Sequence, residues 1–114
     1  MLFFLHPEAR AEIDAIDYYW AVLRKRPDIA EDFADLLTAC RAEMVDPVVS
    51  SRGYRTIFVN GVPTSIKRSS FFYFRGNTYV LYFVIDPNAI RFLALANTSQ
   101  KPDYWIERIF DELP

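Results

Sequence analysis

Residues 77–105 read NTYVLYFVIDPNAIRFLALANTSQKPDYW, in which two apolar runs flank a short turn. The first run, residues 79–85, is interrupted only by tyrosine hydroxyls, and the second, residues 90–96, carries one charge, Arg91. Between them stand Asp, Pro and Asn, which favour turns because proline presets φ and the other two side chains bond their own backbone. The spacing predicts an antiparallel β-hairpin. A strand that is apolar on both faces lies in mid-sheet and is covered on both sides, so the first run is the predicted central strand.

Other strand signals surround this hairpin. Residues 2–5 form a short apolar run, and residues 54–59 resemble a strand that ends at Asn60-Gly61, a hairpin turn whose residues both tolerate positive φ. Residues 62–74 are predicted to form one bent strand, with Pro63 indicating an edge or a bulge. Lys67 and Arg68 should point to alternate faces of that strand. After the last strand, residues 103–113 are expected to form a short helix or an extended tail.

Two amphipathic helices are predicted between the first and second strands. His6-Pro7-Glu8 is typical of a helix start, with His6 as a capping residue, and a second start follows at Pro27, where Asp28 and Glu31 have capping-box spacing. Each helix carries one apolar stripe. The first stripe consists of Ala9, Ile13, Ile16, Trp20 and Leu23, and the second of Ile29, Phe33, Leu36, Leu37, Cys40 and Met44. The short connection between the helices predicts an antiparallel helical hairpin.

This order predicts an α+β fold: an N-terminal strand, then a helical hairpin packed on one face of a mainly antiparallel sheet of four to five strands, then a short C-terminal helix or tail. The other face of the central strand lacks an obvious cover. We expect the terminal segment to supply part of that cover and a partner polypeptide the rest. Aromatic residues make up 17% of the chain, which also favours a surface covered by a partner.

Composition limits the function classes. The 114 residues fit a single domain, residues 1–114, and no apolar run is long enough to cross a membrane. Residues 1–5 are too short for the apolar core of a signal peptide, and the single cysteine, Cys40, excludes an internal disulfide, so a cytoplasmic location is expected. Cys40 is expected to be a buried, inert thiol. The net charge of −2 disfavours a nucleic-acid-binding protein that relies on overall positive charge. We expect no cofactor, metal, membrane or small-molecule ligand.

Four segments resemble the RelE/ParE superfamily of toxins from bacterial type II toxin–antitoxin systems, which includes plasmid stabilisation proteins. Residues 6–9 (HPEA) resemble the family's opening after its first strand, and residues 14–19 (DAIDYY) resemble its first-helix motif. Residues 79–86 resemble its central strand, and residues 94–105 (ALANTSQKPDYW) resemble its last strand and tail. The order and spacing of the four segments span nearly the whole chain.

The resemblance implies a toxin that inhibits a cellular target and is neutralised by a cognate antitoxin. The family often has His and Arg where this chain has Asn-Thr-Ser-Gln at residues 97–100, so the ParE-like branch, with a target such as DNA gyrase, is favoured over an enzyme. Family antitoxins lay an extended or helical segment across apolar surface. The predicted antitoxin-binding residues are Tyr18, Tyr19, Phe72, Phe74 and Tyr82.

Two alternatives remain open. One is a ribosome-dependent mRNA endoribonuclease of the RelE type, for which Arg68, Lys101 and Tyr104 are the candidate catalytic residues. Such a site needs positive charge beside the phosphate and a general base, and an unactivated tyrosine with a pKa of about 10 is a poor base. The other is a non-toxic relic that keeps only the antitoxin-binding fold.

Overall fold

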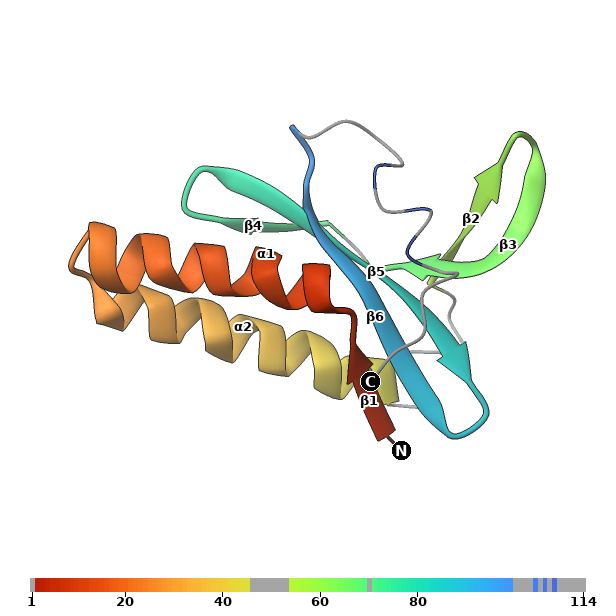
Figure 1. Ribbon diagram of the computed structural model, residues 1–114, viewed down its shortest axis with the longest axis horizontal. Coiled ribbons are helices and arrows are strands. Elements are labelled where there is room, and N and C mark those ends of the chain that lie inside the picture. Colours follow the sequence, from red (N-terminus) through yellow and green to blue (C-terminus); the bar gives the residue numbers. More distant parts are fainter. Residues whose placement is uncertain are drawn as a thin grey trace. The chain divides into compact units, whose positions relative to one another are not determined.

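The computed structural model describes residues 2–45, 54–69 and 71–99 and the single residues Tyr104, Ile106 and Arg108. The chain divides into two compact units, a sheet unit of Met1–Arg10 and Tyr54–Pro114 and a helical unit of Ala11–Gly53, and each is described by itself. In chain order the elements are β1 (Leu2–Leu5), α1 (Pro7–Tyr18), a short π-helix η1 (Tyr19–Leu23), α2 (Pro27–Val45), β2 (Arg55–Val59), β3 (Val62–Arg68), β4 (Phe72–Phe74), β5 (Asn77–Asp86) and β6 (Ala89–Asn97) (Figure 1).

The α+β prediction is confirmed, because two helices and one mixed sheet make up the described chain. Within the described residues the sheet has six strands in the order β1-β6-β5-β3-β2, with β4 also paired to β5. Strand β1 runs parallel to β6, and every other pair is antiparallel. The predicted hairpin is present, with β5 as the strand that contacts β6, β3 and β4 (Figure 1).

The predicted count of four to five strands was wrong because the bent strand of residues 62–74 divides into β3 and β4. Both parts pair with β5, through Arg68 opposite Tyr82 and Phe72 opposite Tyr79. Ser69 bridges the break: its N–H donates to the Leu81 carbonyl at 2.9 Å, and its hydroxyl accepts the Leu81 N–H at 2.9 Å. A side-chain oxygen therefore replaces a missing ladder carbonyl, and the backbone can leave the ladder without leaving a buried donor unsatisfied.

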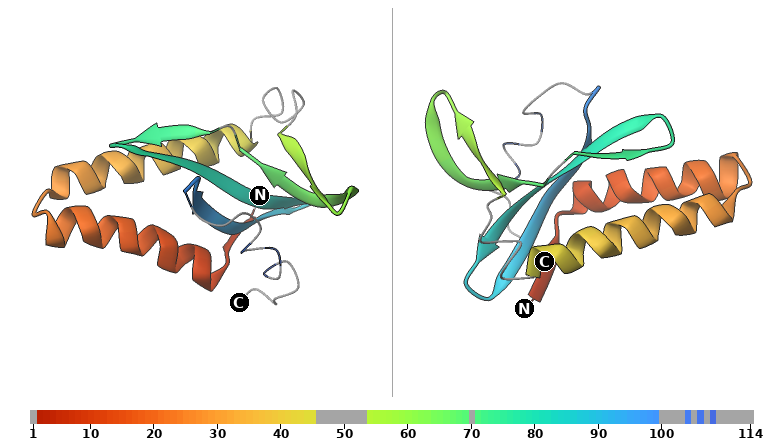
Figure 2. Two further views of the ribbon diagram at one scale, coloured as in Figure 1. Left: turned by 90° about the horizontal axis from the view of Figure 1, so that it is seen from above. Right: turned by 180° about the vertical axis from the view of Figure 1, so that it is seen from behind.

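The helical unit is an antiparallel hairpin, as predicted (Figures 1 and 2). The first helix closes at Lys25, which has a φ of 53°, and the next N–H, of Arg26, donates to the Trp20 carbonyl at 2.7 Å. The left-handed residue turns the chain back toward α2, although a lysine adopts this conformation less readily than a glycine.

The predicted capping box at the start of α2 was wrong. The helix begins at Pro27, as expected, but the N–H groups of Ile29 and Ala30 donate to the carbonyl of Arg26, so Asp28 is not the N-cap residue. Asp28 therefore lies inside the first turn, and its carboxylate accepts two hydrogen bonds from the Arg26 guanidinium, at 3.0 and 2.8 Å. This pairing holds the pKa of Asp28 at about 2, with the side-chain hydrogen bonds as the main cause.

Only some residues of the two predicted apolar helix stripes are buried. Ile29, Phe33 and Met44 of α2 are buried, whereas Leu23, the last residue of the first stripe, is exposed. Cys40 is half-buried rather than buried as predicted, and partial burial raises the pKa of its thiol, which lowers the thiolate fraction. Among the described residues, neither helix combines the length and the hydropathy that a membrane crossing needs.

The start of α1 belongs to the sheet unit. His6 donates its backbone N–H to the Phe92 carbonyl at 3.0 Å, and its Nδ1 accepts the N–H of Glu8 at 3.1 Å. Its carbonyl then accepts the first helical bond, from Arg10. The predicted role of His6 as a helix cap is confirmed, and its ring is buried at that position.

Candidate functional site

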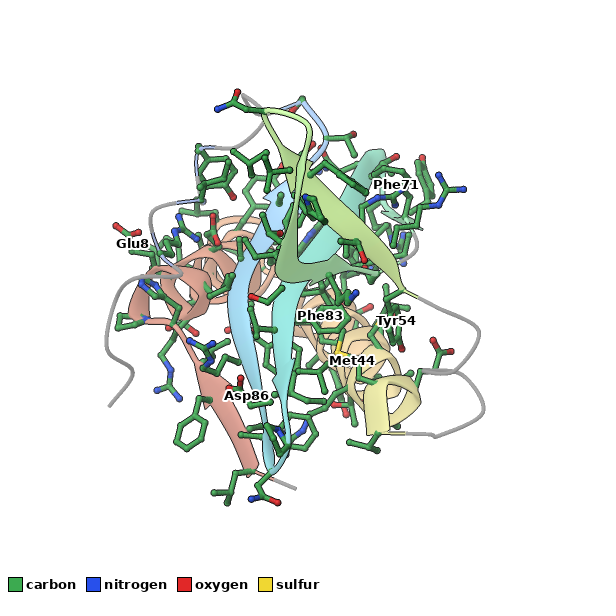
Figure 3. All side chains as sticks on the ribbon, turned by 90° about the vertical axis from the view of Figure 1, so that its right-hand side faces the viewer. Glu8, Met44, Tyr54, Phe71, Phe83 and Asp86 are labelled. Carbon is green, nitrogen blue, oxygen red and sulfur yellow. The ribbon has the colours of Figure 1, made fainter. Side chains whose placement is uncertain are left out.

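Strand β5 presents two different faces. One face, here called the phenylalanine face, carries Phe83, whose ring lies 5.0 Å from that of Tyr54 between centroids (Figure 3). The Phe92 ring lies 6.4 Å from the Phe83 ring on the same face. The other, here called the arginine face, carries Val84, which clusters with Ile66 and the β6 residues Leu93 and Ala94.

A row of four residues crosses the arginine face from one strand to the next. Arg55 of β2 lies opposite Arg68 of β3, Arg68 lies opposite Tyr82 of β5, and Tyr82 lies opposite Ala94 of β6. Directly opposed residues in a sheet project to the same side, with Cβ atoms roughly 4.5–5.5 Å apart. The register therefore places two arginines and a tyrosine at neighbouring positions on one face of the sheet.

A β-bulge sets this row. Near the hairpin turn Val59 pairs with Val62, and that register, if continued, would put Arg55 opposite Ile66. The register shifts between Thr56 and Phe58, and Arg55 then meets Arg68. Thr64 stabilises the irregularity, because its hydroxyl donates to the Ile57 carbonyl at 2.7 Å and accepts the Ile66 N–H at 3.2 Å. Bulges are frequent beside functional sites, where they redirect side chains.

Three described residues near the end of the chain, Tyr104, Ile106 and Arg108, lie on the arginine face. Tyr104 and Ile106 pack against the Ile66 cluster, and the guanidinium of Arg108 lies over the Tyr104 ring at 5.1 Å. Arg108 also donates from Nη1 to the Leu93 carbonyl at 3.0 Å, and its Nε lies 2.9 Å from the Glu8 carboxylate. These three residues therefore cover part of one face of β5, and the rest of the expected terminal helix or tail, residues 103–113, lies outside the described residues.

The expectation of an apolar face left open on the central strand was wrong. Val80 and Val84 on the arginine face are each 2% exposed, and Leu81 and Phe83 on the phenylalanine face are 4% and 0% exposed. These four positions of β5 are buried within the described residues, whereas Ile85, near the β5–β6 turn, is 41% exposed.

The candidate nuclease residues are partly brought together. Arg68 and Tyr104 lie on the same face, since Tyr104 packs on the cluster that also contacts Tyr82, the neighbour of Arg68. Lys101 lies outside the described residues. Lys67 points to the phenylalanine face, where its Nζ donates to the Thr56 hydroxyl at 2.6 Å, so the prediction of alternate faces for Lys67 and Arg68 is confirmed.

The predicted antitoxin-binding residues do not form one surface on the sheet. Phe72 and Phe74 lie on the phenylalanine face, with the Phe72 ring 5.9 Å from that of Tyr79, whereas Tyr82 lies on the arginine face. All three are half-buried. Tyr18 and Tyr19, in the helical unit, are 53% and 44% exposed.

The charges of the arginine face differ in how they are balanced. Arg91 donates to the Asp86 carboxylate at 2.8 Å, and Arg108 is paired with Glu8. Arg68 instead has its guanidinium 4.6 Å from the centre of the Phe71 ring and donates to the Ser69 carbonyl at 3.3 Å. Among the described residues, neither Arg55 nor Arg68 forms an ion pair with a carboxylate.

Sequence patterns did not single out Arg55 as a candidate site residue, because it is an isolated charge at the start of a strand. The Asn60-Gly61 turn was a usable signal, since the hairpin register that it sets already puts Arg55 and Arg68 on the same face. The bulge that makes them direct neighbours depends on the side chain of Thr64 and leaves no pattern in the sequence.

Comparison of the chain with protein-family models, with curated proteins and with solved structures finds no match.

Proposed function

We propose that the protein is the toxin component of a type II toxin–antitoxin module, of the ParE-like kind, which inhibits a cellular target such as DNA gyrase and is neutralised by a cognate antitoxin. The sequence resemblance supplies the family. The observation that carries the partner-binding part is a group of exposed apolar residues on one side of the helical unit. This hairpin-end patch consists of Tyr18, Tyr19, Val22 and Leu23, which are 53%, 44%, 52% and 61% exposed.

The spacing of the hairpin-end patch suits an antitoxin helix. Tyr18 and Val22, and likewise Tyr19 and Leu23, are four residues apart and lie on adjacent helical turns. Tyrosines are enriched at the centres of protein interfaces because each ring buries a large area and keeps a polar tip. An amphipathic helix laid across this patch would bury all four side chains.

The burial and hydrogen bonding of the single histidine, His6, favour inhibition by binding over RNA cleavage. The His6 ring is buried, and its Nδ1 is committed to the helix cap, so it is poorly placed to act as a general base. The ParE-like reading needs no such base.

Co-expression tests the proposal. The chain is expected to arrest growth when induced, and the product of the adjacent open reading frame is expected to relieve the arrest and to co-purify with it. Replacing Val22 and Leu23 by serine should weaken the complex by about 2 kcal/mol, roughly thirtyfold in Kd. Phe58→Ser, at a residue 62% exposed in the sheet unit, is the matched control. No growth arrest and no complex would contradict the proposal, whereas a complex without arrest would indicate a non-toxic relic.

A second candidate is the ribosome-dependent endoribonuclease, favoured by the common face of Arg68 and Tyr104. It predicts mRNA breaks in arrested cells that are lost in Arg68→Ala. The ParE-like function instead predicts intact transcripts and altered DNA supercoiling. Measuring both in the same culture separates the two candidates.

A further inference from the structure

Two arginines stand directly opposite each other on β2 and β3, an arrangement that a sheet normally avoids. Like charges at directly opposed positions repel, because their side chains project to the same side at close range. The other two arginines of the arginine face, Arg91 and Arg108, each have a carboxylate within 3 Å, at 2.8 and 2.9 Å. Within the described chain Arg55 and Arg68 have none.

The local structure holds this opposition in place. The Thr64 hydroxyl donates one hydrogen bond and accepts another inside the bulge that moves Arg55 from Ile66 to Arg68. The Arg68 guanidinium is oriented by the Phe71 ring on one side and by the Ser69 carbonyl. Arg55 is exposed, so its side chain is free to turn toward a ligand beside Arg68. A repulsive pair that is built into a defined geometry is expected where a bound group of opposite charge offsets the repulsion.

We propose that Arg55 and Arg68 form a binding site for a phosphate dianion, carried as free phosphate or as a phosphate monoester. Two guanidinium groups supply two positive charges and planar pairs of N–H donors, which match phosphate oxygens in geometry. A phosphate monoester carries a charge of about −1.5 to −2 at pH 7, so it balances both arginines, whereas a carboxylate or a phosphodiester balances only one. The site does not depend on the proposed toxin function.

Titration with inorganic phosphate at pH 7.5 and constant ionic strength, followed by NMR of the arginine Nε–H and β2–β3 amide signals, tests the site. Saturable shifts are expected in the natural sequence. Arg55→Gln and Arg68→Gln should each weaken binding at least tenfold, while Arg55→Lys, which keeps the charge but loses the planar donors, should weaken it less. Arg24→Gln, at an exposed arginine of the helical unit, is the control and should bind as before.

Three further probes identify the source of the phosphate. O-phosphoserine binding more tightly than free phosphate indicates a modified side chain, and AMP binding more tightly indicates a nucleotide end. Dimethyl phosphate, a monoanion, should bind more weakly than either. Shifts that do not saturate, shifts that persist in Arg55→Gln, or equal binding of dimethyl phosphate would overturn the proposal. The amide spectrum of each variant reports whether it is folded, and failure of the co-expression test leaves this result unchanged.

Discussion

Replacing Arg108 tests whether the terminal segment is an integral cover of the sheet. Arg108 is 9% exposed, and besides lying over the Tyr104 ring its guanidinium contacts the buried Leu93 carbonyl at 3.0 Å and the exposed Glu8 carboxylate at 2.9 Å. Arg108→Met keeps the length and the apolar stem but removes both polar contacts. Glu8→Gln removes only the ion pair.

The two losses should differ in size. A hydrogen bond from a charged group to a buried carbonyl contributes about 1.5–3 kcal/mol, and its removal leaves the Leu93 carbonyl without that donor in a residue that is 1% exposed. The Glu8 side chain is 66% exposed, so solvent screens its ion pair to about 0–1 kcal/mol. We therefore expect Arg108→Met to lower the free energy of unfolding by about 2–3 kcal/mol and Glu8→Gln by about 1 kcal/mol or less.

Urea denaturation of both variants and of the double variant measures these quantities. In 1 M NaCl the effect of Glu8→Gln should largely disappear, because the Debye length falls to about 3 Å, while the effect of Arg108→Met persists. A loss below about 0.5 kcal/mol for Arg108→Met is typical of a surface position. That result, or equal losses in the two variants, would refute the burial of the Leu93 carbonyl by this segment.

Three other perturbations test the helix ends. His6→Ala removes the side-chain acceptor at the start of the first helix and should cost about 1 kcal/mol in thermal or urea unfolding, with His6→Asn recovering part of the loss. Lys25→Gly relieves a φ of 53° and should stabilise the protein by up to about 1 kcal/mol, whereas Arg24→Gly, at a φ of −91°, should destabilise it by a similar amount. Asp28, with its pKa at about 2, should contribute its ion pair above about pH 4 and lose it as the pH falls through 2; Arg26→Gln should return the pKa toward 3.8 in an NMR carboxyl titration.

Hydrophobic periodicity predicted the larger helices and strands of this chain because the burial of their apolar side chains determines where they form. The continuous apolar run of β5 predicted that this strand lies in the middle of the sheet. The turn residues between β5 and β6 favour a tight reversal of the chain, which predicted that β6 pairs with β5. The α2 stripe places Ile29, Phe33 and Met44 inside for the same reason. In each case many side chains act together, so a single exception does not change the outcome.

The positions that sequence patterns missed depend on single hydrogen bonds. Ser69 ends β3 by offering a hydroxyl in place of a backbone carbonyl, and Thr64 stabilises the bulge that sets Arg55 opposite Arg68. Serine and threonine at such positions look like ordinary polar residues of a strand. The capping box failed similarly, because Arg26 competes for the Asp28 carboxylate that the pattern assigns to the helix backbone.

The irregularities of the sheet gather at the arginine row rather than along the strands at random. The β2–β3 register shifts next to Arg55, β3 ends immediately after Arg68, and the β5–β6 register shifts next to Tyr82, where Leu93 is the extra residue. At each interruption a specific side chain forms a hydrogen bond with the backbone; at Leu93 this side chain is Arg108, which donates to the carbonyl. A sheet selected for stability alone has no need of three interruptions at one level, since each weakens the ladder. Their coincidence with two opposed arginines is the structural feature on which the proposed phosphate site rests.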